Sequence, residues 1–279
     1  MVMWGVKESK EIFYKTDHEI ELIRQSCLLN CEVIAYVGSL IKPGVTGKYL
    51  DQKAEEMILD KGALPAFKGF KGYEHTLTVS INAQVVHGIP SEREISEGDI
   101  VSIDCGTIFN GFCGDAAYTY ALEGANANVL ELLRITKESL LKGVEQAVIG
   151  KRIGDIGFAI FDLCERRNNY GVVRDLTGHG LGRSMHEDPE VPNYGKRGTG
   201  VVLRKGLVIA IEPMINMGTK EVVSLRDGWT IVTADNKPAA HYEHTVAITG
   251  NKPNVLTSFV LIEEKEKNNV NLLEIKSKL

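Results

Sequence analysis

An Asn-Gly pair at positions 110–111 separates two apolar runs and constrains the fold more than any other feature of the sequence. Such a pair strongly favours a two-residue turn between antiparallel strands, so it predicts a β-hairpin. In that hairpin Asp104 lies opposite Ala117, and Asp115 lies opposite Gly106. Strand alternation then puts both carboxylates on one face as diagonal neighbours, with Cα atoms ~7 to 8 Å apart. Two metal ions ~3.5 to 4 Å apart could bridge that gap.

Helical patterns precede and follow this hairpin. Thr16 and Glu19 match a capping box, and apolar residues then recur at steps of three and four. Strand-like alternation begins at position 76, and from position 176 onward the chain reads as strands and loops. The predicted helices cover 17–39, 46–62, 128–147 and 155–168.

Two stretches of the chain resemble each other, which bears on domain organisation. Segments 41–62 and 148–171 each contain an apolar stub, a glycine turn and an amphipathic helix that ends at Gly. This weak repeat fits two related halves packed on one antiparallel sheet. We therefore expect one catalytic domain over 1–279, with 1–15 as an N-terminal extension. The charged tail, about 260–279, is expected to be a solvated extension or a short terminal helix.

Charge and cysteine usage exclude several classes of protein. The net charge of −5 argues against a protein that mainly coats phosphates, so we predict no specific nucleic-acid binding. The five cysteines are an odd number without paired metal spacing, which indicates reduced thiols. No apolar run approaches the ~18 to 20 residues that a membrane span needs, and the N-terminus lacks a signal-peptide pattern. These observations predict a cytoplasmic protein.

Further metal-ligating residues accompany the two hairpin carboxylates. Asp104 and Glu212 each close an apolar strand, where an unpaired carboxylate is costly and no basic residue is near in sequence. His179 lies between two glycines in TGHGLGR, and Glu243 lies in the strand-like AHYEHTVAITG. Taken singly, each is more often a surface or core residue. Four carboxylates with one imidazole form an oxygen-rich set that suits Mn, Fe or Co better than a thiolate zinc site does.

These five residues resemble the ligand set of bacterial-type (type I) methionine aminopeptidases. The resemblance extends from the first predicted helix to about Thr249 and includes several further motifs. The motifs are VSINAQVVHGIP at 79–90, GHGLGR at 178–183, HEDP at 186–189 and RDGWT at 226–230. The implied fold class is α+β, in the pita-bread arrangement. In it, two pairs of helices with pseudo-twofold symmetry cover a curved antiparallel sheet.

The resemblance also implies roles for the metal ligands. Asp115 and Glu243 would bridge two divalent ions, Asp104 would complete the shell of one, and His179 and Glu212 would complete the shell of the other. The ions would be Co, Mn or Fe, with Zn or Ni as alternatives. The hydroxide between them would be the nucleophile that attacks the scissile carbonyl, since metal binding lowers the pKa of water to about 7.

Other residues match catalytic and substrate-binding positions of the family. Glu212 would be the general base, and His87 and His186 would contact the scissile amide and stabilise the oxyanion. The positions that match the family's methionine pocket are Phe67, Phe70, Tyr73, Met185 and Trp229. Where many bacterial relatives carry Cys, this chain has Thr78, which affects the shape expected for the pocket.

The implied activity is metal-dependent removal of the initiator methionine from nascent polypeptides whose second residue is small. The implied partners are nascent N-termini, with transient ribosome association, and the protein is expected to be a monomer. Prolidase and aminopeptidase P relatives are an alternative, but they usually carry an N-terminal domain, and only about 75 residues precede the first β segment here. Type II enzymes carry a helical insert that the short gaps from His186 to Glu243 do not accommodate. A non-catalytic pita-bread binding protein is the other alternative, although such proteins usually lack some of the ligands.

Overall fold

A computed structural model describes residues 11–277 of the chain. The first ten residues of the expected N-terminal extension and the last two of the tail lie outside the described residues. The α-helices are α1 (Asp17–Leu40), α2 (Gly47–Asp60), α3 (Ala127–Val144), α4 (Ile153–Phe161) and α5 (Val260–Asn268). No helix among the described residues combines the length and the apolarity that a membrane span requires.

Within residues 11–277 the strands form two five-stranded and two three-stranded sheets, and their pairings are antiparallel. The first sheet contains β1 (Leu64–Pro65), β4 (Ile100–Phe109), β5 (Phe112–Leu122) and β16 (Leu272–Leu273), with β2 (Leu77–Ile81) also paired to β4. The second runs in the order β15 (Asn254–Val255), β14 (His244–Ala247), β9 (Val208–Ile211), β7 (Gly178–Gly180) and β8 (Glu187–Val191). One three-stranded sheet has the order β13 (Ala239–His241), β10 (Met214–Asn216) and β6 (Gly171–Val172). The other has the order β11 (Val222–Ser224), β12 (Ile231–Thr233) and β3 (Gln84–Val86).

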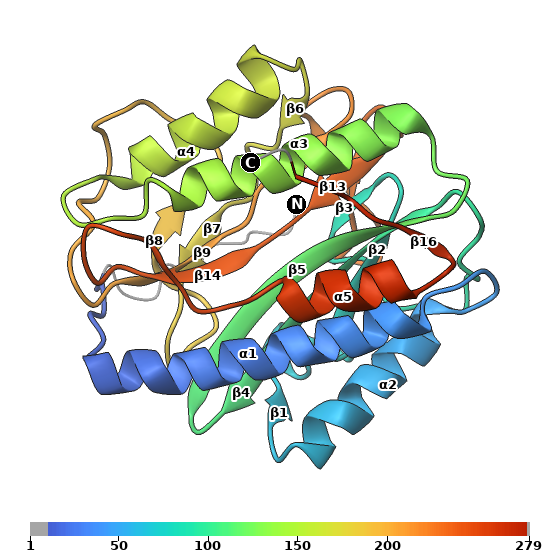
Figure 1. Cartoon of the computed structure of the whole chain (residues 1–279), viewed down its shortest axis with the longest axis horizontal. Coiled ribbons are helices and arrows are strands. Elements are labelled where there is room, and N and C mark those ends of the chain that lie inside the picture. Colours follow the sequence, from blue (N-terminus) through green and yellow to red (C-terminus); the bar gives the residue numbers. More distant parts are fainter. Residues whose placement is uncertain (1–10, 278–279) are drawn as a thin grey trace.

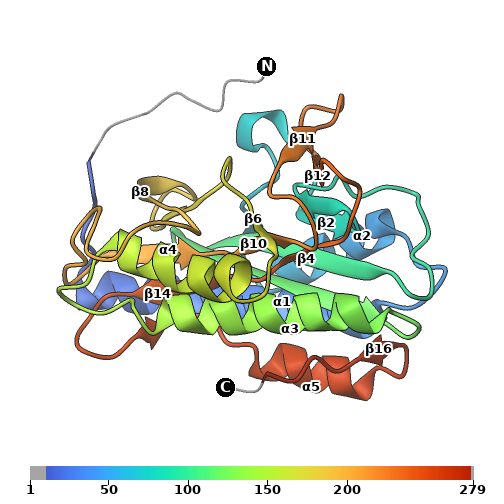
Figure 2. The same cartoon turned by 90° about the horizontal axis from the view of Figure 1, so that it is seen from above.

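The helices and the loops lie on opposite faces of the sheets. Figure 1 shows α1 and α2 beside the first sheet and α3 and α4 beside the second, with long strands between the two pairs. Seen from above, α1 and α3 lie at a similar level, α5 lies outside them, and the β11–β12 hairpin rises from the other side (Figure 2). The α+β class and the antiparallel sheet covered by helix pairs are therefore confirmed.

The predicted helix boundaries are close to the observed ones at the starts and less so at the ends. Thr16 makes the predicted capping box with Glu19, and Thr46 caps α2. The third helix ends three residues before the predicted position 147. The fourth begins earlier than predicted because Asp155 accepts the backbone N–H of Arg152. It changes to a π-helical turn (η2, Asp162–Arg166) instead of continuing to 168 as an α-helix.

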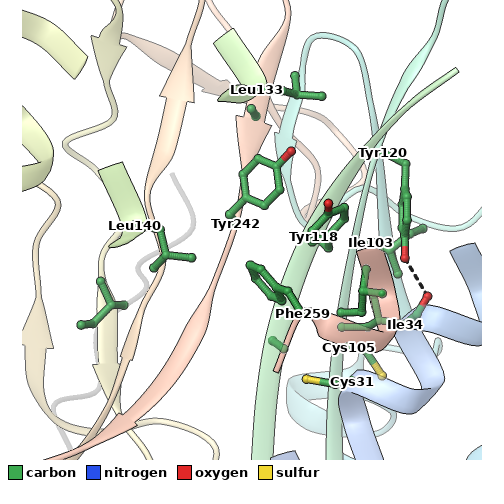
Figure 3. Packing of buried hydrophobic residues seen from close by; sticks show 14 of the residues in the cluster. Cys31, Ile34, Ile103, Cys105, Tyr118, Tyr120, Leu133, Leu140, Tyr242 and Phe259 are labelled. Carbon is green, nitrogen blue, oxygen red and sulfur yellow. Dashed lines mark hydrogen bonds between the residues drawn. The ribbon is translucent and has the colours of Figure 1, made fainter. Parts of the chain in front are cut away.

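A cluster of tyrosines packs between α1, β5 and the C-terminal helix (Figure 3). Tyr118 and Tyr242 are fully buried and meet edge to face, with ring centroids 5.0 Å apart. The Tyr120 hydroxyl donates to the Ile34 carbonyl oxygen of α1 at 2.9 Å. A Cβ atom at Gly38 would lie 2.3 Å from that hydroxyl oxygen, so α1 can approach β5 this closely only with glycine there. This packing holds β5, and therefore Asp115, against the helical layer.

Candidate metal centre and substrate pocket

The hairpin formed by β4 and β5 has the predicted register. Asn110 and Gly111 both have positive φ (53° and 77°), the geometry that a two-residue turn requires. Asp104 pairs with Ala117, and Gly106 pairs with Asp115. The two carboxylates are 8% and 3% exposed, so they are as buried as strand context predicts.

Glu243 reaches the same place from the second sheet. It lies just before β14 and donates its backbone N–H to the Ala117 carbonyl oxygen at 3.0 Å. Two residues on, the Thr245 hydroxyl donates to the Asp115 carbonyl oxygen at 2.8 Å. These bonds join the two five-stranded sheets and carry the Glu243 side chain, 2% exposed, toward the hairpin carboxylates.

His179 lies on β7, where glycines allow close packing of the backbone. A Cβ atom at Gly178 would lie 2.3 Å from the Ala210 carbonyl oxygen of the neighbouring strand. The His179 Nδ1 atom lies 2.9 Å from the Gly180 carbonyl oxygen, which directs Nε2 away from the backbone. Nε2 then lies 3.5 Å from Asp115 Oδ2 and 3.5 Å from the Glu212 Oε1 atom.

The electrostatics of these residues fit a divalent cation. Ligand atoms of Asp115, His179 and Glu243 lie within 4.8 Å of one another. Among the described residues, Asp104 Oδ1, Asp115 Oδ1 and Glu243 Oε1 are buried without a hydrogen-bond partner. Burial, followed by repulsion from the neighbouring carboxylates, holds the pKa of Asp104 and of Glu243 well above the usual range. Negative charge without a donor is costly in the interior, and a bound cation offsets it.

The pKa of the imidazole among these carboxylates is also raised, but for a different reason. Burial alone would lower the pKa of His179, but the Asp115 and Glu212 carboxylates outweigh burial and raise it to about 9. The neutral imidazole that a metal requires would therefore form as the cation replaces the proton.

Glu212 directly follows β9 and has two neighbours that the sequence analysis did not identify. The Asn193 side-chain amide donates to the Glu212 carbonyl oxygen at 2.9 Å. His241, 2% exposed at the end of β13, has its Nε2 atom 3.6 Å from Glu212 Oε2. His241 stands two residues before Glu243, and side chains two apart in a strand point to the same face, so strand alternation could have indicated that His241 lies near the metal ligands. Asn193 lies in a loop and gave none.

His87 and His186 both lie beside this cluster. The His186 ring is 4.4 Å from the His179 ring and 5.1 Å from the Phe70 ring, centroid to centroid. His87 follows β3 in the left-handed region, with φ of 57°. Burial lowers the pKa of His87 to about 4. The pKa of His186 is also lowered, by desolvation and then by the nearby His179 and His87. Both imidazoles are therefore neutral near pH 7.

A cavity of about 540 Å³ opens over these residues. All five predicted metal ligands, both histidines and four of the five predicted pocket residues line it. Met185 does not; it is buried in a core cluster against which Phe67 packs. A Cβ atom at Gly106 would lie 2.4 Å from Met185 Cε and 2.7 Å from Phe67 Cε1. The lining residues that the sequence did not indicate include Asp175, Leu176, Thr177, Glu190, Val222 and Ser224, which come from loops and strand ends.

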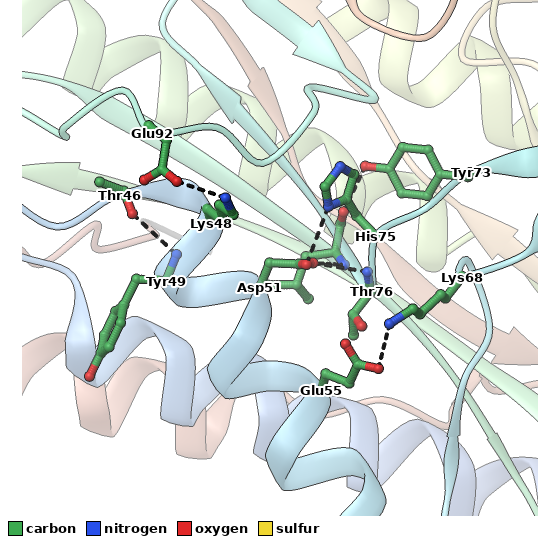
Figure 4. Close-up of polar contacts among 11 residues, drawn as sticks. Thr46, Lys48, Tyr49, Asp51, Glu55, Lys68, Tyr73, His75, Thr76 and Glu92 are labelled. Carbon is green, nitrogen blue, oxygen red and sulfur yellow. Dashed lines mark hydrogen bonds and ion pairs between the residues drawn. The ribbon is translucent and has the colours of Figure 1, made fainter.

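The aromatic side of the cavity is fixed through α2 (Figure 4). Asp51 Oδ1 on that helix accepts the backbone N–H groups of Thr76 and Leu77 at 2.9 and 2.8 Å. The Tyr73 hydroxyl donates to the Leu77 carbonyl oxygen at 2.7 Å, and the Tyr73 and Trp229 rings meet edge to face 4.9 Å apart. These bonds fix the start of β2, which brings Thr78 opposite Asp104.

Comparison with known proteins identifies the family to which the chain is similar. Residues 21–250 match the model of metallopeptidase family M24. A methionine aminopeptidase of Clostridium perfringens is 48% identical over 246 residues, which cover 88% of this chain and 98% of that protein. The structure of the Thermotoga maritima methionine aminopeptidase matches with a TM-score of 0.87 and 42% identity, over 89% of this chain and 100% of that one.

A prolidase structure from Pyrococcus furiosus shares the fold at greater distance. It matches with a TM-score of 0.72 and 25% identity, over 88% of this chain but only 65% of that one. Together these similarities confirm the predicted pita-bread fold. A metallopeptidase family also implies divalent metal ions, in agreement with the charge of the buried cluster.

Proposed function

The chain belongs to metallopeptidase family M24 as one of the methionine aminopeptidases, which remove N-terminal methionine, and we propose that five of its side chains hold two divalent ions for this reaction. They are Asp104, Asp115, His179, Glu212 and Glu243. The observation that carries the proposal is the convergence of buried carboxylate oxygens that have no hydrogen-bond donor. When bound, the ions would activate a water molecule for attack on the scissile carbonyl.

The distances favour particular ligand assignments. Asp115 and Glu243 offer ligand atoms within 4.8 Å of each other and of His179, and each carboxylate has a second oxygen with which it could be shared between two ions. His179 Nε2 is equally close to Asp115 and Glu212, so His179 and Glu212 would serve one ion. Asp104 would serve the other. The oxygen-rich set fits Co, Mn or Fe, with Zn or Ni as alternatives.

The remaining polar groups would move and place protons. The Glu212 carboxylate would accept the proton of the attacking water as general base, while Asn193 holds its backbone in place. His87 and His186, both neutral near pH 7, can each donate a hydrogen bond to the scissile amide. Such donors stabilise the developing oxyanion by roughly 3 to 4 kcal/mol in comparable sites.

The cavity would receive the methionine side chain against Phe67, Phe70, Tyr73 and Trp229, which line it. An aromatic lining suits a flexible thioether. Met185 would shape this pocket from behind Phe67. The natural substrates would be nascent polypeptides with a small second residue. The protein would act as a monomer and would meet these substrates in the cytoplasm, at the ribosome exit.

A paired peptide assay after metal reconstitution tests this function. We expect cleavage of Met-Ala-Ser and no cleavage of a peptide with a different first residue followed by proline. Preference for the proline peptide would instead indicate the prolidase branch of the family. Stable folding without activity under any divalent ion would indicate a binding protein. The His186→Ala variant should lower kcat on Met-Ala-Ser by about 100-fold if His186 donates to the oxyanion.

A further inference from the structure

A buried ion pair lies behind the loop that carries Met185 and His186. The Lys15 Nζ atom is 2.5 Å from Glu187 Oε2, and the two side chains are 5% and 7% exposed. Lys15 comes just before α1, and Glu187 opens β8, directly after His186. Neither residue lines the substrate cavity. The pair therefore connects the start of the first helix to a segment of the site 172 residues away.

Both members of the pair pack directly against the loop 182–186. A Cβ atom at Gly182 would lie 2.4 Å from Glu187 Oε1 and 2.6 Å from Lys15 Cε. Glu187 Oε1 also accepts the backbone N–H of Ser184 at 3.4 Å. The loop thus lies against this carboxylate at Gly182 and is hydrogen-bonded to it at Ser184.

Lys15 is itself held firmly by the surrounding backbone. Its backbone N–H donates to the Gly206 carbonyl oxygen at 2.7 Å, and its ammonium group also donates to the Phe13 carbonyl oxygen at 3.0 Å. A second link from the same helix start is the Glu19–Arg183 ion pair, at 3.5 Å. Arg183 is 69% exposed in its side chain, so this link is weaker than the buried one.

We propose that the Lys15–Glu187 pair is a positioning device that holds the His186 imidazole at the scissile bond. The inference rests on the proposed role of His186. Charge-assisted hydrogen bonds are short and directional, so they fix a loop more strictly than apolar contacts do. A displacement of about 1 Å in a catalytic group can reduce the rate by about 100-fold.

The test separates positioning from simple support of the fold. Lys15→Met leaves Glu187 buried and unpaired, which should destabilise the protein as well as displace the loop. The double variant Lys15→Met/Glu187→Met removes both charges, and apolar replacement of a buried pair is often neutral for stability. We expect the double variant to regain the parent melting temperature. Its kcat on Met-Ala-Ser should stay at least about tenfold below the parent value, with a smaller change in KM.

A readout independent of turnover is the NMR cross-peak of the His186 imidazole in the metal-free protein, assigned with a His186→Gln variant. It should shift in both Lys15 variants. Lys205→Met is the matched control, because it breaks the exposed Lys205–Asp17 pair at the same helix start. That control should change neither kcat nor the cross-peak. Parent-like kcat and cross-peak in the double variant would overturn the proposal. A parent-like kcat in His186→Ala would instead overturn the proposed role of His186. The cross-peak distinguishes the two failures, because it reports whether the ion pair positions the His186 ring even if that ring has no role in turnover.

Discussion

Individual buried carboxylates form most of the proposed metal site. Asp104, Asp115 and Glu243 are each less than a tenth exposed, and each keeps an oxygen without a donor among the described residues. In the absence of a cation these groups oppose folding, because water solvates a carboxylate far better than the interior does. The residues that bind metal are therefore expected to reduce the stability of the metal-free protein.

Asp104→Asn should separate these two effects. The amide keeps the shape of the side chain and removes one charge from a group of mutually repelling carboxylates. In chelator, the variant should melt above the parent at pH 7.5, by ~2 to 4 °C for each kcal/mol gained. With metal restored, it should not cleave Met-Ala-Ser. Calorimetry and the peptide assay check the two halves, and a lower melting temperature in chelator would contradict the argument.

His241 should matter for metal binding although it is outside the predicted ligand set. It is 2% exposed and 3.6 Å from Glu212, the position of a residue that orients a ligand. Loss of such a neighbour typically costs about 10- to 100-fold in metal affinity or activity. We expect that reduction for His241→Ala, measured by calorimetric metal titration. His241→Gln, which keeps a donor, should retain more of the affinity, and equal affinities for both variants would argue against an orienting role.

Secondary-structure elements with a strong local signal were the predictable part of this fold. The turn at 110–111 has its own sequence code, so strand parity alone placed Asp104 beside Asp115. His179 lies on β7, Glu212 directly follows β9, and Glu243 directly precedes β14. Their convergence depends on long-range pairing, which local patterns do not encode. The family resemblance supplied that information. Asn193, in a loop, and Glu190, on β8, had no signal of either kind.

The charged C-terminal segment was expected to be either a solvated extension or a short terminal helix. A helix, α5, occupies 260–268 and lies beside α1 (Figure 1). Its Ile262 and Glu266 are fully buried, because the helix covers the tyrosine cluster. The Glu266 carboxylate accepts from the Tyr118 hydroxyl at 3.1 Å. Helix α5 thus has two positions that face the core, although its sequence is strongly charged.

This arrangement makes the docking of α5 sensitive to pH. Burial raises the pKa of Glu266 from 4.5 to about 7, although Lys137 and Tyr118 lower it in part. A raised carboxyl pKa gives stability that is complete below about pH 4.5 and is lost as pH rises through about 7. The free energy of unfolding of Glu266→Gln should therefore increase relative to that of the parent between about pH 5 and 8, by at most about 3 kcal/mol. Parallel melting curves of the metal-free proteins measure this difference, and a pH-independent difference would rule it out.

At the scale of the whole molecule, the residues of the proposed metal centre come from both halves of the fold. Asp104 and Asp115 belong to the hairpin packed on α1, whereas His179, Glu212 and Glu243 lie on or directly beside strands of the second half. Two direct hydrogen bonds, from Glu243 to Ala117 and from Thr245 to Asp115, also cross this boundary. A cation bound by both sets of ligands would add a link that neither half can form alone.

Metal binding should therefore stabilise both halves together. At free Mn²⁺ 100-fold above Kd, binding to the folded state alone adds ~2.7 kcal/mol to stability. Hydrogen exchange should then slow in β4 and β5 and, equally, in β9 and β14, because opening either half would release the ion. Asp104→Asn is the control, and its exchange should respond much less to Mn²⁺. Protection confined to the hairpin half would mean that the ion is held by Asp104 and Asp115 without the second set of ligands. In that case the centre would not join the halves, and the five-residue site would need to be reassigned.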